Sequence, residues 1–321
     1  MDLAVYLPLL LGIALAVVTP SVVRVMPPRT GMWCLTAGAV IAAANWFAFL
    51  VIIAFTGLGR ISFVASQGHW SAARWRGLDP VGIWTARAAG VVLIACLGWF
   101  AVTFVRQLSA RRAVRALNGG FGTDETLVIV DDEAPHAYSI GGRRPRIVIS
   151  RGLLQELSAA ERRAVLSHEA AHVQHHHDVH LLVVRLAAAM NPMLHRFVAT
   201  AVFAVERWAD EQTATVVGDR RLVARTLVRA ALAGVGSVGR PDAALAHAAS
   251  DVHHRVTALL AGPPRQRWSV TSATTLLLLA TLMSPLLAAN NLTALLDRAS
   301  STAPAVHTTA HGRRSVINDG R

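Results

Sequence analysis

One short stretch of the sequence has residue types and a spacing that fit metal chemistry. Positions 168–172 read His-Glu-Ala-Ala-His, which matches the pattern H-E-x-x-H. On a helix, His168 and His172 lie four residues apart on one face, so both imidazoles can bind the same metal ion. Glu169 lies one residue further round, where its carboxylate can reach a water molecule at the metal. The stretch therefore predicts a catalytic zinc site with Glu169 as general base.

A catalytic zinc ion usually has three protein ligands and one open position, so a third ligand is needed. We expect Glu206, because it lies on a helix that follows a break at Asn191-Pro192 and a helical hairpin would bring it to the histidines. Asp210, one turn further on, suits the carboxylate that accepts the free N–H of a ligand histidine. One zinc ion per chain would then acidify water to a pKa of about 7. Glu169 would take the proton and deliver it to the leaving amine.

Other polar residues near the motif leave alternatives open. The histidine cluster comprises His175, His176, His177 and His180. It could form a second metal site, but a polar extension of the same helix or a wall of the cleft is favoured, because all four cannot share a face with the first zinc. His177 and Arg255 are candidates for substrate or oxyanion contact, although Arg255 could equally face the membrane. Glu206 could also be an ordinary surface acid paired with Arg207.

The elements that must position these residues can be read from local patterns. Ser158-Ala-Ala-Glu161 is a capping box and predicts the start of the helix that carries the zinc motif. Short β-branched runs predict strands at 126–130, 137–140 and 146–150. Helices are predicted at 193–217, ended by Gly218, and at 220–233.

Long apolar segments predict a membrane protein. The chain has 321 residues, of which 53% are hydrophobic, and its mean hydropathy is +0.43. Segments long enough to cross a bilayer are 3–23, 32–58, 84–105 and 268–292. The run 181–205 could be a fifth span, but Arg185, Asn191-Pro192 and Arg196 interrupt it and are costly in lipid. We expect instead a helical hairpin packed in the domain or against the membrane surface.

The positions of the arginines predict the topology. Every basic residue is arginine, the net charge is +12, and the arginines flank the apolar spans. By the positive-inside rule, the domain at 106–267 lies in the cytoplasm, whereas the N-terminus, the loop 59–83 and a short disordered tail at 293–321 lie outside. Arg60, Arg74 and Arg76 in the outer loop and Arg313, Arg314 and Arg321 in the tail run against this rule. No groove-reading motif accompanies the charge, so direct nucleic-acid binding is not expected. The two cysteines, Cys34 and Cys96, exclude a disulfide scaffold and a cysteine-ligated zinc site.

Several segments together resemble a known family of membrane peptidases. They are 137–141, 146–154, 157–172, 177–178, 191–192 and 206–210. These segments resemble the gluzincin membrane peptidases, especially the BlaR/MecR antirepressor family, with HtpX-like and CAAX-prenyl-protease-like peptidases as close kin. The resemblance implies that His168, His172 and Glu206 bind zinc, that Glu169 is the base and that Asp210 supports the site. It implies a mainly α, multi-pass protein with an α+β zincin-like domain and a small β-sheet.

The layout and two departures from the family shape the expected function. Three spans before the domain and one after it resemble BlaR/MecR, whereas HtpX-like chains more typically have two before the motif. The penicillin-binding sensor domain of BlaR/MecR is replaced by the short tail, and histidines stand at 175–177 where relatives often have Arg or Lys. The main expectation is a signalling-type protease that cleaves itself or a transcriptional repressor, with substrate added as a strand at 137–140. An HtpX-like quality-control protease and a non-catalytic receptor or scaffold with a structural zinc are the alternatives. Oligomeric state stays open.

Overall fold

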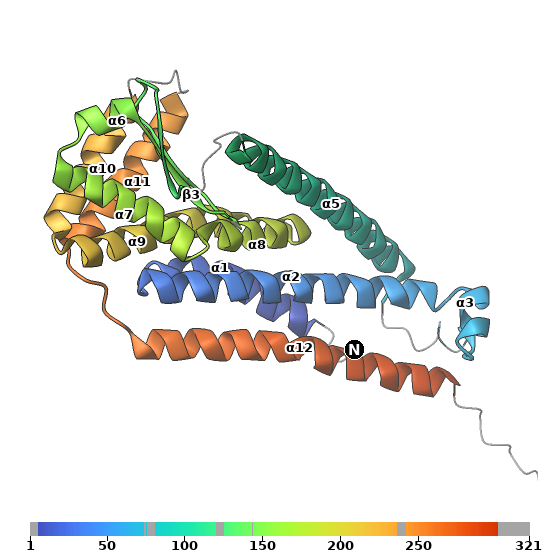
Figure 1. Cartoon of the computed structure of the whole chain (residues 1–321). Coiled ribbons are helices and arrows are strands. Elements are labelled where there is room, and N and C mark those ends of the chain that lie inside the picture. The colour runs from blue at the N-terminus through green and yellow to red at the C-terminus, as the bar shows by residue number, and fades with distance from the viewer. Residues whose placement is uncertain are drawn as a thin grey trace, which may run out of the picture.

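The protein is described by a computed structural model that covers residues 6–73, 75, 81–119, 125–142, 144–235 and 242–300. Long helices form one part of the molecule, and a helical region with a small sheet lies at one end of them (Figure 1). Arg74, Arg76 and the tail arginines lie outside the described residues.

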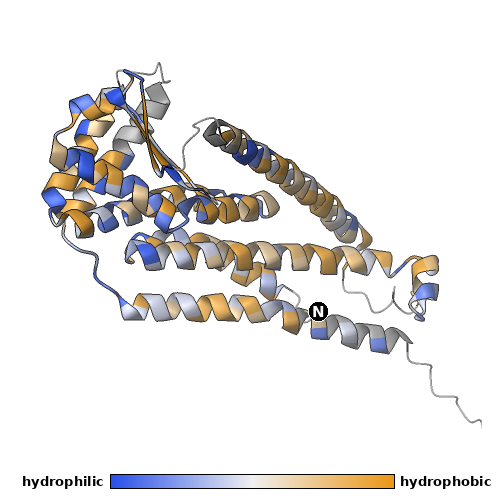
Figure 2. Ribbon diagram, viewed as in Figure 1, coloured by the Kyte–Doolittle hydropathy of each residue, from blue (hydrophilic) through white to orange (hydrophobic). Residues whose placement is uncertain are grey.

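Four apolar helices correspond to the predicted spans: α1 (Leu7–Val23), α2 (Pro28–Leu58), α5 (Ile83–Gly119) and α12 (Trp268–Ser300). In the described part of the chain, α2, α5 and α12 contain stretches long and apolar enough to cross a membrane, and α1 is a shorter apolar helix. Figure 2 shows many hydrophobic residues along α5, as expected for a helix that crosses a membrane.

Two of these helices extend beyond their predicted ends. Helix α5 continues from the predicted end at 105 to Gly119, so the predicted domain boundary falls inside a helix. The added turns carry arginines and alanines, which are good helix formers. Helix α12 continues to Ser300, so residues 293–300 are helical and not part of a disordered tail. The prediction failed at both places because hydropathy marks the apolar stretch, not the helix end.

The small sheet has three strands, β1 (Leu127–Val130), β2 (Ala137–Ile140) and β3 (Arg146–Ser150). All three predicted strands are confirmed. Strand β3 is buried along its whole length and lies between the other two, parallel to β1 and antiparallel to β2. Strand β2 is therefore at an edge of the sheet, where its outer backbone groups can pair with another chain.

The helices that follow the sheet carry the predicted motif, and the first two of them pack against its strands. In chain order they are α6 (Arg151–Glu156), α7 (Ala159–Gln174), α8 (His177–Met190), the 3₁₀ turn η2 (Pro192–Leu194), α9 (His195–Val217), α10 (Arg220–Val235) and α11 (Asp242–Leu260). The capping box at the start of α7 is confirmed: the Ser158 N–H donates to Glu161 Oε2 at 2.9 Å, and the Glu161 N–H donates to Ser158 Oγ at 3.4 Å. Gly218 ends α9 with φ of +76°, which glycine adopts without steric cost.

The apolar run 181–205 forms a hairpin and not a single fifth span. Asn191 ends α8, accepts a hydrogen bond from the Met193 N–H at 3.0 Å and donates to the Ala42 carbonyl of α2 at 3.2 Å. Val184 and Phe197, one from each arm, are fully buried in a core shared with α1, α2 and α12. The predicted hairpin is confirmed, and it packs against the spanning helices themselves.

Candidate active site

Helices α7 and α9 bring the three predicted metal ligands together. His168 Nε2 lies 3.2 Å from His172 Nε2 and 3.3 Å from Glu206 Oε2, and His172 Nε2 lies 3.6 Å from Glu206 Oε1. The two histidines are one turn apart on α7, and the hairpin returns α9 alongside α7 to present Glu206. Within the described residues, these three side chains are the group whose ligand atoms converge closely enough to hold a metal ion.

The distances between these atoms fit tetrahedral zinc. Zinc bonds to imidazole nitrogen and carboxylate oxygen are about 2.0–2.2 Å, so ligand atoms at tetrahedral angles lie about 3.4 Å apart. The three observed separations bracket that value. Two imidazole nitrogens and one carboxylate form the donor set of a catalytic zinc site, in which the fourth position is taken by water, and not of a closed structural site with four protein ligands.

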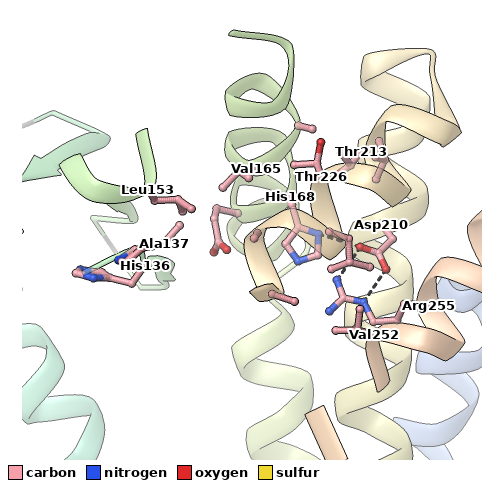
Figure 3. A pocket seen from close by; sticks show the side chains of 17 residues that line it. His136, Ala137, Leu153, Val165, His168, Asp210, Thr213, Thr226, Val252 and Arg255 are labelled. Carbon is pink, nitrogen blue, oxygen red and sulfur yellow. Dashed lines mark hydrogen bonds and ion pairs between the residues drawn. The ribbon is translucent and has the colours of Figure 1, made fainter. Parts of the chain in front are cut away.

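Asp210 lies where a carboxylate supports the first histidine. Its Oδ1 is 3.2 Å from His168 Nδ1, and the two face each other across α7 and α9 (Figure 3). Although burial alone would lower the pKa of His168, hydrogen bonds to Asp210 and Glu206 raise it to about 9. These carboxylates therefore favour positive charge at His168, either as a proton or as a metal cation at Nε2.

Arg255 of α11 completes the carboxylate network. Its Nε and NH2 donate to the two oxygens of Asp210 at 2.7 Å each, and its NH1 lies 3.0 Å from Glu206 Oε2. This fork holds Asp210 and Glu206 in fixed positions and compensates part of the cost of burying them. Arg255 also lines the cavity next to the motif, so it does not face the membrane.

His177 supports the second ligand histidine. Its Nδ1 lies 3.0 Å from His172 Nδ1, and its side chain is 1% exposed, packed against Trp208. Burial and the adjacent histidines lower its pKa to about 3, so the ring is neutral and its Nδ1 can accept the His172 N–H. His177 thus contacts a predicted ligand histidine and does not line the cavity beside Glu169.

The other members of the histidine cluster point in separate directions. The His175 ring stacks on Trp208 with centroids 4.6 Å apart. The Nδ1 of His180 lies 2.9 Å from the hydroxyl of Thr36 on α2, and its ring meets Trp33 edge-on. In the described part of the chain they do not form a second metal site: His175 packs on α9, and His180 connects α8 to α2.

Glu169 lies in a cleft beside the sheet edge. A cavity of about 450 Å³ is lined by Glu169 and His168, by His136 and Ala137 at the start of β2, and by apolar side chains of α7 and α10. A hydrogen bond joins Glu169 to Ser139 of β2, and burial raises the pKa of the Glu169 carboxyl above its usual range. A carboxylate with a raised pKa, beside a site for a metal ion and open to a cavity, can accept and return a proton.

Sequence reasoning placed the ligands but missed two contacts. The sequence suggested Arg255 only as an oxyanion or membrane-facing residue, because its ion pairs depend on how α11 packs on α9. The pairing of His177 with His172 follows from the turn between α7 and α8, where His176 has φ of +51°. That turn breaks the helical periodicity, so periodicity alone could not predict the pairing.

Comparisons with known proteins point to the same chemistry. Residues 106–251 match the profile of Peptidase family M48, which covers a little under half of the chain. The chain is 29% identical over 143 residues to a protease HtpX homolog of Nitrosomonas eutropha, which is 44% of this chain and 43% of that protein. It is 32% identical over 103 residues to a protease HtpX homolog of Chlorobium limicola, which is 31% of this chain and 35% of that protein.

The matches cover only part of this chain and of its relatives. The chain matches less than half of the length of the curated relatives. No solved structure matches the chain significantly. The matches support an M48-type membrane metallopeptidase and do not single out the BlaR/MecR family. The apolar helices and the HtpX homologues together support a membrane protein.

Proposed function

We propose that the chain is a membrane-embedded zinc metalloendopeptidase with one zinc ion per chain. The convergence of His168, His172 and Glu206 at tetrahedral spacing, with Glu169 in the adjoining cleft, is the observation that carries the proposal. A receptor with a structural zinc has no need of a carboxylate such as Glu169 beside the metal site, so this alternative is disfavoured.

The residues of the site divide the work of peptide hydrolysis. Zinc, when bound, acidifies water and polarises the scissile carbonyl. Glu169 takes one proton from the attacking water as its oxygen bonds to the carbonyl carbon, and it delivers that proton to the amine as the C–N bond breaks. Asp210 and His177 each accept an N–H from a ligand histidine and thereby keep the Nε2 atoms turned toward the metal.

The edge strand offers a place for an extended substrate. Within the described residues, no strand pairs with the outer edge of β2, and Ser139 near its middle contacts Glu169. A peptide added along this edge passes the catalytic carboxylate with its backbone held by hydrogen bonds. The cavity at the Ala137 end has walls formed by Leu153, Val165 and Leu227, among others, so it fits an apolar substrate side chain.

The side of the membrane on which the peptidase region lies limits the substrates that it can reach. We place the peptidase region on the cytoplasmic side, with both termini outside. The arginines at 24, 29, 106, 111 and 112 lie at the ends of the spans that adjoin this region, and the positive-inside rule places such arginines in the cytoplasm. The alternation of helix directions supports two opposite sides: α3 (Ser62–Gln67) lies at the far end of α2 from the sheet (Figure 1). Three apolar helices, α1, α2 and α5, precede the peptidase region, and three spans before this region resemble the BlaR/MecR layout. This layout supports a signalling-type protease acting on itself or a cytoplasmic regulator such as a transcriptional repressor.

A quality-control role is the second candidate, since the curated relatives named above are protease HtpX homologs. The test is a comparison of cells that produce the wild-type chain or its Glu169→Ala variant. We expect fragments that appear only with the wild type. A few cytoplasmic targets would support signalling, and many membrane proteins would support quality control. Identical fragment patterns from both chains would overturn the peptidase assignment.

A further inference from the structure

A second cavity lies away from the catalytic cleft and is lined by arginines. Its volume is about 490 Å³, and its walls include Arg24 of the α1–α2 turn, Arg207 of α9, and Arg265 and Arg267 of the segment before α12. Among the described residues, the rest of the lining is apolar, backbone or proline, without an acidic side chain. Four arginines around one cavity, without an acidic side chain in the described lining, create a positive potential that favours an anion.

Arg207 is the most enclosed of the four cations, and among the described residues no carboxylate forms a close ion pair with it, although Asp210 and Glu211 are near enough to attract it. The nearest candidate acids on its helix are committed elsewhere: Glu211 forms a two-bond pair with Arg220 at 2.6 and 2.8 Å, and Asp210 pairs with Arg255. The Nε of Arg207 is buried without a hydrogen-bond partner, and its NH1 makes one long bond of 3.4 Å to the Arg24 carbonyl. A buried guanidinium N–H without an acceptor is costly, and Arg207 lines the cavity, so an anion bound there would offset part of the cost of burying this charge.

The position of this cavity relative to the membrane indicates which anion it can meet. It lies where α1 ends at Val23, where α2 begins at Pro28 and where α12 begins at Trp268. The N-terminal ends of α2 and α12 lie on the same side of the helix bundle in Figure 1. Trp268 is 75% exposed next to Arg267, as expected for an indole at the membrane interface. These helix ends therefore set the cavity at the level of lipid headgroups.

We propose that this arginine cavity binds the phosphate of an anionic phospholipid headgroup. Guanidinium groups bind phosphate oxygens through paired hydrogen bonds, and basic pockets between spanning helices on the cytoplasmic side suit such headgroups. Arg207 directly follows the metal ligand Glu206 on α9, so a bound headgroup fixes the helix that carries two residues of the catalytic network. The proposal does not depend on peptidase activity.

Lipid binding by the full chain in neutral detergent tests this proposal. The titrants are phosphatidylglycerol, phosphatidylcholine and inorganic phosphate, and the variants are Arg207→Gln and the double variant Arg265→Gln/Arg267→Gln. The matched control is Arg162→Gln/Arg163→Gln, which removes the same charge from exposed positions of α7. We expect saturable binding of phosphatidylglycerol but not phosphatidylcholine, and a loss of about tenfold or more in affinity for the cavity variants only.

Three results would overturn the proposal. One is equal loss of affinity in the α7 control, which would show general charge attraction. Another is the same affinity for phosphatidylcholine as for phosphatidylglycerol. The third is binding of inorganic phosphate as tightly as the lipid, which would identify a site for free phosphate. Because Arg265 and Arg267 are exposed, their variant tests the site even if Arg207→Gln does not fold.

Discussion

At the residue scale, the site depends on which atoms hold the ligand histidines in place. His168 is held by a carboxylate, whereas His172 is held by another imidazole, His177. An imidazole can accept the His172 N–H only through an unprotonated nitrogen, and the burial of His177 keeps it neutral. The two ligands are thus oriented by chemically different groups.

We predict that His177→Leu weakens zinc binding by about 10–100-fold, because His172 loses the acceptor that orients it. His177→Asp should retain most of the affinity, since a carboxylate oxygen can accept the same N–H. Competition with a chromophoric zinc chelator measures the affinity, and the visible spectrum of the cobalt-substituted protein reports ligand geometry. Equal affinity of wild type and His177→Leu would show that His177 does not position the ligand.

The residue types and spacing in the sequence predicted the three ligands, the base and Asp210 as one site, and the structure brings these residues together. Helical periodicity is enough to predict that His168 and His172 share a face, and a hairpin is enough to predict that Glu206 lies beside them. Arg255 and His177 could not be placed in the same way. The position of Arg255 depends on tertiary packing of α11, and that of His177 depends on a left-handed residue at position 176 that no local pattern announces.

At the element scale, the start of α7 stabilises the motif helix. Glu161 accepts hydrogen bonds from the Ser158 hydroxyl and N–H and from Arg229 of α10. These bonds hold the pKa of the Glu161 carboxyl below its ordinary value. A lowered folded-state pKa means that the ionised carboxylate stabilises the fold above the unfolded pKa, and that this contribution is lost as the pH falls through the folded value.

We therefore predict that Glu161→Gln lowers the thermal unfolding temperature at about pH 7 and that the difference from wild type shrinks toward about pH 3. Thermal unfolding in detergent at several pH values measures it. Glu156→Gln, at an exposed position at the end of α6, is the control and should have little effect. A difference that grows as the pH falls would contradict the stabilising role of the ionised carboxylate.

The turn between α8 and α9 is the second critical element, because it brings Glu206 back to α7. Asn191→Ala removes the bond to the Met193 N–H and the bond to the Ala42 carbonyl, both in a buried place. We predict a loss of about 1–3 kcal/mol in the free energy of unfolding. Denaturant titration in mixed micelles measures it. Asn290→Ala on the exposed side of α12 should leave the free energy of unfolding nearly unchanged. An equal loss in both variants would show that the bonds of Asn191 in the turn do not specifically stabilise the protein.

At the scale of the whole molecule, the active site lies next to the spanning helices. The α8–α9 hairpin shares one core with α1, α2 and α12, and His180 contacts Thr36 of α2. Hydropathy predicted the apolar helices and the hairpin, but it could not predict that the hairpin packs against those helices, because packing partners are not encoded in hydropathy. The helices that carry the candidate metal ligands are therefore in direct contact with apolar helices long enough to cross a membrane.

The most direct test of the proposed function is cleavage of an unfolded protein by the purified, zinc-loaded full chain in detergent, with Glu169→Ala measured beside it. Zinc content is determined for both proteins. We predict that both hold about one zinc ion per chain and that the variant cleaves about 10²–10⁴-fold more slowly, because the general base is gone. Equal cleavage by the two zinc-loaded proteins would contradict the assignment of Glu169 and the peptidase site built around it.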